Sequence, residues 1–169
     1  MILDKLAAEA RKRVAILKNQ KSLDMIKSEA KALPKGNFVF EKALRRNDIS
    51  FITEVKKASP SKGLIAKDFE YIRIAKEYET AGAAAISVLT EPTAFLGCDQ
   101  YLKDIRKVVG IPLLRKDFTV DEYQIYEAKT IGADAILLIC ALLDTETIRK
   151  YLAICDELGL SALVEAHDA

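Results

Sequence analysis

The chain has 169 residues, of which 50% are hydrophobic and 30% are charged, and this composition is typical of a soluble globular domain with a sizeable core. Its formal net charge of +1 gives no overall basic field, so the composition offers no support for nucleic-acid binding. A sole histidine, His167, and three cysteines without a Cys-x-x-Cys pair argue against a structural zinc site.

The residues near the amino terminus and the cysteines indicate the compartment. Charges at Asp4, Lys5 and Glu9 interrupt any signal-peptide core, and the chain has no uninterrupted run of 18 apolar residues. We therefore expect a cytoplasmic protein that does not contact a membrane. We also predict small buried thiols, which fit a reducing cytoplasm, for the three cysteines that lie beside apolar or helix-like sequence: Cys98, Cys140 and Cys155.

Three helices are expected before the first strand. Residues 2–18 place apolar side chains at helical spacing, which predicts an amphipathic helix with Arg11, Lys12 and Arg13 turned mostly away from its apolar face. This helix lacks Trp and Phe and its apolar face is partly alanine, so we interpret it as packed on the domain and not as a membrane anchor. Shorter helices are predicted over 22–31 and 38–44, with a break at residues 33–37.

A strand with two charged residues follows at about 50–55. Glu54 and Lys56 are two residues apart, so on a strand both side chains face one way with their Cα atoms roughly 6–7 Å apart. Such charges must pair with each other or meet a charged ligand if they are buried, and the other interpretation is a surface edge strand with solvated charges. The loop that follows contains Ser59, Ser61, Lys62 and Gly63 and could bind an anion through hydroxyl, ammonium and backbone N–H groups.

A repeat from residue 49 onward decides the fold class. A glycine after a helix-like stretch, then small residues and a short apolar run, recurs from Gly82, Gly132 and Gly159 and more loosely from Gly110. We predict helices over 71–81, 100–109, 121–131 and 145–158. The expected strands lie near residues 50–55, 84–89, 112–115, 135–139 and 161–165.

Parallel strands joined by helices form either an open doubly wound sheet or a closed eight-stranded barrel. Polar residues stand at the carboxyl end of one strand after another, and in a barrel these ends meet over one pocket. We therefore predict an α/β protein with a (β/α)8 TIM barrel. The polar residues in question are Glu54, Lys56, Thr90, Glu91, Lys116, Asp117 and Glu165.

A complete barrel of this kind needs around 250 residues, so we expect the chain to be truncated after the fifth parallel strand. The expected organisation is an N-terminal helical extension over residues 1–47 and a partial barrel over residues 48–169. Unpaired sheet edges would be exposed in such a fragment, which could self-associate through them.

Five ordered motifs closely resemble indole-3-glycerol phosphate synthase: the stretch from Glu54 to Gly63, Ser87-Val88-Leu89-Thr90-Glu91 with Phe95 and Gly97, residues 114–118, residues 132–139, and residues 163–167. The resemblance implies a carboxy-lyase of tryptophan biosynthesis. Its phosphorylated small-molecule substrate is 1-(2-carboxyphenylamino)-1-deoxyribulose 5-phosphate, and its products are indole-3-glycerol phosphate, carbon dioxide and water. No cofactor and no metal are implied.

The resemblance also implies roles for individual residues. Lys116 would be the general acid on the substrate carbonyl, and Glu165 would transfer a proton during the final dehydration, with Lys56 as its acid partner or as a substrate anchor. Glu54 would hold the lysine ammonium groups and balance positive charge on the ring nitrogen. The substrate would also contact two further residues, Ser59 and Phe95.

The family's remaining site residues, including its phosphate grip, lie on strands six to eight, so we expect negligible synthase activity from the 169-residue chain alone. Two alternatives remain open. One is another phosphate-binding barrel, such as an aldolase that forms a Schiff base through Lys56 or Lys116. The other is a non-catalytic half-barrel that assembles with a partner. His167 is interpreted as a loop or helix-cap residue, and Arg115 as a partner of Asp117 or a cover for apolar surface.

Overall fold

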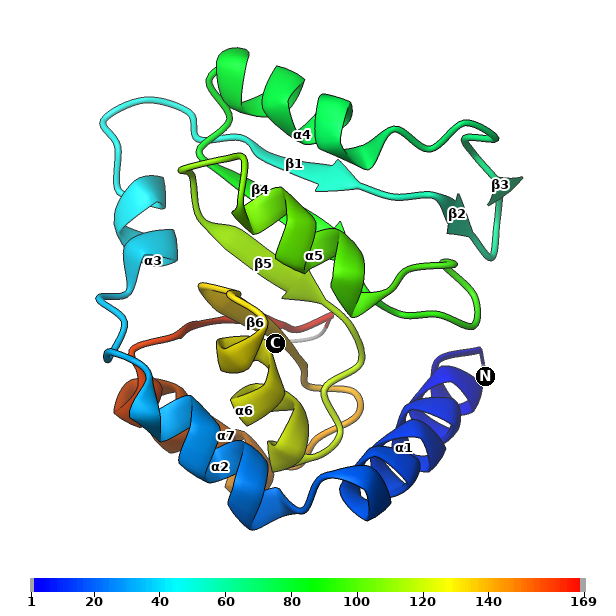
Figure 1. Cartoon of the computed structure of the whole chain (residues 1–169), viewed down its shortest axis with the longest axis vertical. Coiled ribbons are helices and arrows are strands. Elements are labelled where there is room, and N and C mark those ends of the chain that lie inside the picture. Colours follow the sequence, from blue (N-terminus) through cyan, green and yellow to red (C-terminus); the bar gives the residue numbers. More distant parts are fainter. Residues whose placement is uncertain (1, 168–169) are drawn as a thin grey trace.

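The computed structural model describes residues 2–167. It confirms the five predicted strands to within two residues, as β1 Ile52–Val55, β4 Ala85–Leu89, β5 Leu113–Lys116, β6 Ala135–Ile139 and β7 Ser161–Glu165. All neighbouring pairs are parallel, in the order β1-β4-β5-β6-β7 (Figure 1). This order follows the chain without the reversal that defines the switch point of a doubly wound sheet, so it corresponds to five consecutive strands of a (β/α)8 barrel.

The helices between successive strands are also confirmed, as α4 Tyr71–Thr80, α5 Asp99–Arg106, α6 Glu122–Thr130 and α7 Thr145–Leu158. Asp121 and Asp144 cap α6 and α7 by accepting hydrogen bonds from the backbone N–H groups of Tyr123 and Thr147. Three helices precede β1: α1 Ile2–Gln20, α2 Leu23–Ala32 and α3 Val39–Leu44. The division of the chain between residues 47 and 48 into an extension and a barrel stays a prediction.

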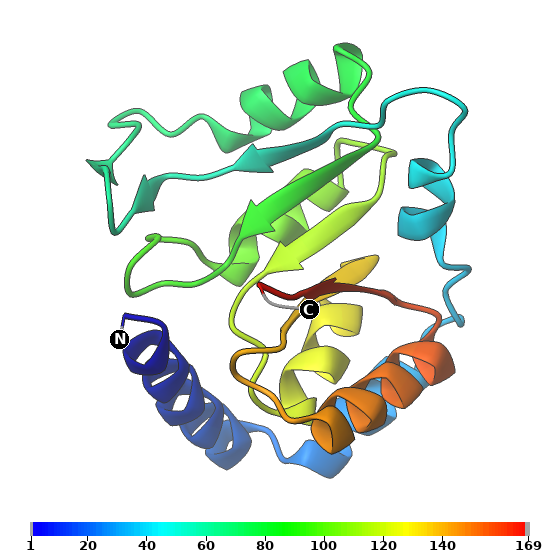
Figure 2. The same cartoon turned by 180° about the vertical axis from the view of Figure 1, so that it is seen from behind.

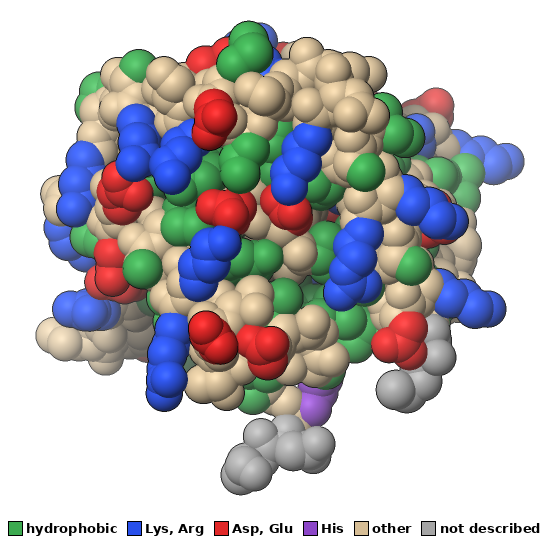
Figure 3. Space-filling model, turned by 90° about the horizontal axis from the view of Figure 1, so that it is seen from below, with side chains coloured by type: hydrophobic (Ala, Val, Ile, Leu, Met, Phe, Trp, Pro, Cys, Tyr) green, Lys and Arg blue, Asp and Glu red, His purple; other side chains and the backbone are tan. Residues whose placement is uncertain are grey.

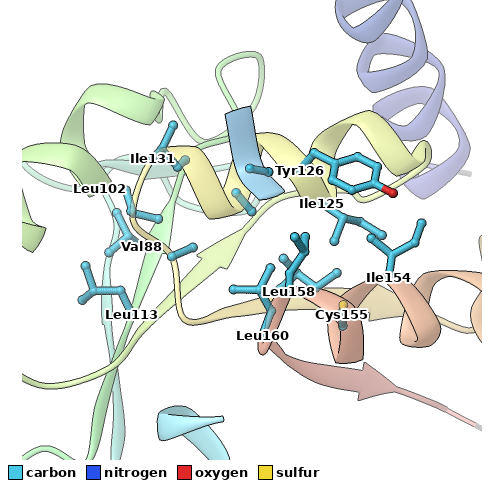
Figure 4. Close-up of a cluster of buried hydrophobic side chains, with 14 of the residues drawn as sticks. Val88, Leu102, Leu113, Ile125, Tyr126, Ile131, Ile154, Cys155, Leu158 and Leu160 are labelled. Carbon is cyan, nitrogen blue, oxygen red and sulfur yellow. The ribbon is translucent and has the colours of Figure 1, made fainter. Parts of the chain in front are cut away.

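The outer face of the sheet carries the main hydrophobic core, because alternate strand residues point toward the helices. Val88 and Leu113 pack there against Leu102 of α5, and the cluster continues through α6 and α7 (Figure 4). Leu102 and Leu113 are completely buried. Helix α2 adds Ile26 and Ala30 to the same cluster, so the helical region before β1 and the sheet share one core.

The inner face of the sheet is closed at the amino ends of the strands by α3. Phe40 of this helix packs against Ala85, Leu114 and Ala135, which point away from the main core. The next inner-face positions along the strands, including Leu89, Lys116 and Leu137, line a cavity at the carboxyl ends. The inner face therefore has an apolar plug at one end and polar groups at the other.

Several features differ from the sequence-based expectations. Ala58–Ser59 and Gly63–Leu64 form a small antiparallel hairpin, β2 and β3, where we expected only a loop. Cys155 is buried as predicted, but Cys98 is half-buried and Cys140 is exposed because it lies in the turn after β6. Arg13 is half-buried and does not point away from the domain, whereas Arg11 and Lys12 are exposed as predicted.

The edges of the sheet are open in the described part of the chain. β1 pairs only with β4, and β7 pairs only with β6. Apolar side chains are exposed near both edges, including Ile49 and Phe51 beside β1 and Val164 in β7. Self-association through these edges stays a prediction.

The surface gives further information on partners. Basic and acidic side chains are interspersed over the face seen in Figure 3, which agrees with the near-neutral net charge. Within residues 2–167, no helix is long and apolar enough to span a membrane.

A matched pair of glycine substitutions tests the junction between α7 and the segment before α3. Gly159 and Gly82 both have positive φ angles, +70° and +88°, which an alanine adopts only with strain of about 1–2 kcal/mol. A Cβ at Gly159 would also overlap the carbonyl oxygen of Gly36, whereas a Cβ at Gly82 would meet no atom within 4 Å. We expect Gly159→Ala to lower the free energy of unfolding by about 1–3 kcal/mol more than Gly82→Ala does.

Urea unfolding followed by circular dichroism measures both variants. Equal losses of stability would contradict the close backbone approach of Gly36 and Gly159.

Candidate functional site

The charged pair that opens the candidate site lies at the end of β1. The Lys56 ammonium donates to Oε1 of Glu54 over 2.6 Å, and both side chains are about one-third exposed. The two charges therefore pair with each other. This is one of the two arrangements that the sequence predicted for charges buried here, and the other was contact with a charged ligand. Because β1 is also an edge strand in the described sheet, the pair remains accessible to solvent and to a ligand.

Three predicted site residues from separate elements line one cavity of about 120 Å³: Lys116, Glu165 and Phe95. Lys116 ends β5 and Glu165 ends β7, so the parallel sheet brings a cation and a carboxylate 49 positions apart to the same end of the sheet. Five apolar residues form most of the remaining wall, Leu3, Leu89, Phe118, Leu137 and Ile139, and the acidic residues Glu91 and Asp117 complete it. An aromatic or aliphatic group between the two charges would fit this lining.

The loop that carries Phe95 is held by Glu91. This carboxylate is only 1% exposed and accepts hydrogen bonds from the backbone N–H groups of Thr93, Ala94 and Phe95, at 2.7–3.1 Å. A Cβ at Gly97 would overlap the carbonyl oxygen of Leu89, so the loop returns to β4 through a contact that requires glycine. Glu91 also lines the cavity with Lys116 and Glu165, as its place after a strand end predicted, while its carboxylate binds the backbone of its own loop.

A second cavity of about 650 Å³ adjoins the first and contains Lys56 and Ser59. Phe95 and Phe118 line both cavities, so the two spaces share one aromatic wall. The Ser59 hydroxyl accepts a hydrogen bond from the backbone N–H of Lys62 over 3.2 Å. This bond closes the turn between β2 and β3.

A buried charge network lies directly behind Lys116. Arg115, the preceding residue, is 4% exposed and donates to Glu127 over 2.7 Å and to Asp99 over 2.9 Å. Asp117 lies 3.8 Å away from the same guanidinium. Burial alone would lower the pKa of Arg115, but the three surrounding carboxylates raise it above its ordinary value. Arg115 is therefore a permanent cation that ties α5 and α6 to β5, and its partners go beyond the expected Asp117.

His167 lies closer to the site than we expected from the sequence. Its Nε2 is 3.0 Å from Oε1 of Glu165, and its side chain is exposed. The imidazole donates to this carboxylate when Nε2 carries a proton, and it makes no such hydrogen bond when the proton is on Nδ1 alone. The contact places His167 beside the site without making it part of the cavity wall.

The sequence did not single out Leu3 and Phe118 as members of the site. Phe118 had a usable signal, because it follows Lys116 by two residues at the end of a predicted strand. Leu3 had none, because it is far from the other site residues along the chain. Only the packing of α1 on the domain brings it to the cavity. No group of three or more potential metal ligands occurs among residues 2–167.

A comparison with models of protein families shows to which family the chain belongs. The model of indole-3-glycerol phosphate synthase matches residues 3–169. The chain belongs to this family. Curated indole-3-glycerol phosphate synthases match 99% of the chain, with identities of 64% in Ruminiclostridium cellulolyticum, 57% in Endomicrobium trichonymphae and 49% in Lachnoclostridium phytofermentans.

The chain spans about 65% of the length of these indole-3-glycerol phosphate synthases, since the matches cover 65%, 66% and 66% of the three relatives. The five motifs that suggested the resemblance all lie within the matched region. Membership of the family and the parallel α/β architecture are thereby both established, and each agrees with the prediction made from the motifs.

Proposed function

We propose that the protein takes part in the indole-3-glycerol phosphate synthase reaction, the conversion of 1-(2-carboxyphenylamino)-1-deoxyribulose 5-phosphate to indole-3-glycerol phosphate, carbon dioxide and water in the cytoplasm. One observation carries the proposal: Lys116 and Glu165 line one cavity together with Phe95 and a largely apolar wall, to which Glu91 and Asp117 also contribute. The family membership adds to this support.

The first step joins a ring carbon of the substrate to its carbonyl carbon, and the carbonyl oxygen gains a proton. Lys116 donates that proton, because an ammonium at the end of a rigid strand provides both the proton and a favourable field for the developing negative charge. The carboxylate on the attacking ring carbon then leaves as carbon dioxide, and the electrons of the broken carbon–carbon bond return to the ring. Phe95 packs against the ring during these steps.

The final step expels the new hydroxyl group as water and removes a proton to complete the indole. Glu165 transfers a proton in this step, and Lys56 acts as its acid partner or anchors the anionic substrate. Glu54 holds the Lys56 ammonium over 2.6 Å and balances positive charge on the ring nitrogen. Ser59 contacts the anionic part of the substrate from the second cavity.

A chimera tests the proposal. It joins residues 1–169 to the part of the Ruminiclostridium cellulolyticum synthase that the chain does not match, and the complete relative is the positive control. We expect the chimera to form indole-3-glycerol phosphate, measured by the fluorescence of the indole product, within about tenfold of the relative. A folded chimera without product formation would contradict the proposal.

Borohydride trapping tests the alternative of a Schiff-base enzyme. Borohydride added with substrate is expected to trap no covalent adduct, whereas an adduct on Lys56 or Lys116 would indicate a Schiff-base enzyme.

A further inference from the structure

The amino-terminal helix α1 forms part of the wall of both cavities. Leu3 lines the smaller cavity, and Ile2, Leu3 and Leu6 line the larger one. In Figures 1 and 2 the amino end of α1 lies on the side toward which the arrowheads of β4 and β5 point. The helix therefore borders the carboxyl ends of the strands, where Lys116 and Glu165 lie.

One partly buried ion pair links α1 to the segment that carries Lys116. Nη2 of Arg13 is 2.7 Å from each carboxylate oxygen of Asp117, although the residues are 104 positions apart. The Asp117 side chain is 3% exposed and the Arg13 side chain 23%, so solvent screens this pair only weakly. Nη2 alone bridges the two oxygens, and the partly buried, charge-assisted contact holds α1 against this segment.

Asp117 transmits this contact to the site. It follows Lys116 directly, and its carboxylate also accepts hydrogen bonds from the Thr90 hydroxyl at 3.1 Å and from the backbone N–H of Phe118 at 2.8 Å. One side chain thus connects α1, the end of β4 and the turn between Lys116 and Phe118. Asp117 itself lines the smaller cavity, so Arg13 contacts a residue of the cavity wall.

A second ion pair between α1 and the same segment provides a comparison. Lys18 contacts Asp121, the residue that caps α6, over 2.7 Å, with both side chains about one-third exposed. Lys18 is about 1.4 turns further along α1 from Leu3 than Arg13 is. Among the hydrogen bonds described for residues 2–167, its partner Asp121 makes none with the residues around Lys116. Exposed single-contact pairs of this type contribute little to stability.

We propose that Arg13 is a positioning residue for the substrate's aromatic ring. By clamping α1 to Asp117, it holds Leu3 opposite Phe95 and Phe118, and it thereby sets the affinity of the apolar cavity. Arg13 touches no reacting atom, so its removal loosens substrate binding and leaves the proton transfers by Lys116 unchanged. This inference rests on the proposed function.

Kinetics of the chimera test the proposal with three variants: Arg13→Gln, Arg13→Lys and the control Lys18→Gln. We expect Arg13→Gln to raise KM at least tenfold while kcat changes by less than threefold and the pH profile of kcat is unchanged. Arg13→Lys keeps the positive charge on a shorter side chain with different donor geometry and should recover part of the affinity. Lys18→Gln should change KM by less than twofold. Equal KM values for Arg13→Gln and Lys18→Gln would overturn the proposal.

Hydrogen exchange gives a readout that does not depend on activity. In the 169-residue chain, Arg13→Gln should speed deuterium uptake along the amino-terminal half of α1, whereas Lys18→Gln should affect only its last turn. Unchanged uptake in the amino-terminal half would overturn the proposal even if KM rises. An inactive unmodified chimera would instead defeat the proposed function, and the exchange experiment would still decide whether Arg13 docks α1.

Discussion

We expect the substitution Lys116→Gln to lower kcat/KM of the chimera by about 10²–10⁴-fold, which is the usual contribution of a positioned general acid. The side chain ends β5 within the cavity shared by Glu165 and Phe95, and glutamine keeps its approximate length while removing its proton and charge. Because the loss concerns the chemical step, most of it should appear in kcat. Steady-state formation of indole-3-glycerol phosphate measures both parameters.

Lys107→Gln is the matched control for Lys116→Gln. Lys107 follows α5, is exposed and pairs with Asp104 on the surface, so its removal should change kcat/KM by less than twofold. Unfolding curves of both variants separate a catalytic loss from a loss of folded protein. Activity of Lys116→Gln within tenfold of the unmodified chimera would refute the role of Lys116 as the general acid.

The largest effect on stability is expected for Arg115→Met. This substitution leaves Glu127 and Asp99 without the guanidinium that they share, and it also removes a hydrogen bond to the backbone carbonyl of Gln124 at 3.1 Å. Removing one partner from a buried ion pair typically destabilises a protein by about 3–5 kcal/mol, because the remaining charges stay buried. We expect a loss of this size in the free energy of unfolding of the chain, measured with urea.

Arg73→Met provides the comparison, because Arg73 also bridges two carboxylates, Glu70 and Glu77, but on the surface. Its side chain is 60% exposed, and we expect a loss of at most about 1 kcal/mol. Similar losses for Arg115→Met and Arg73→Met would mean that the network behind Lys116 is not buried in solution.

The strands and helices of the repeat could be read from the chain because their signals are local. A glycine after a helix, such as Gly132 or Gly159, and a short apolar run each depend only on neighbouring residues. The same local signals placed Lys116 and Glu165 at strand ends, and the parallel direction of the strands then implied a common edge. That inference holds in the structure, where both residues line one cavity.

The hairpin of β2 and β3 and the role of Glu91 were not predictable in this way. β2 and β3 are only two residues each, too short for a periodic pattern. Glu91 follows the end of β4 by two residues and lines the cavity as expected, but the three hydrogen bonds that its carboxylate accepts from its own loop backbone had no sequence signal. Which polar group a side chain contacts depends on the path of the loop, and strand periodicity carries no information about it.

The amino-acid sequence alone determined the order of the elements, the family and the strand ends that carry the charged residues, because periodicity, turn residues and motifs are written along the chain. The tertiary packing decided that α1 borders the mouth, that Arg13 meets Asp117 and that Leu3 enters the cavity. The physical reason is that an amphipathic helix specifies which of its faces is buried but not the surface against which that face packs. That surface exists only once distant segments have come together.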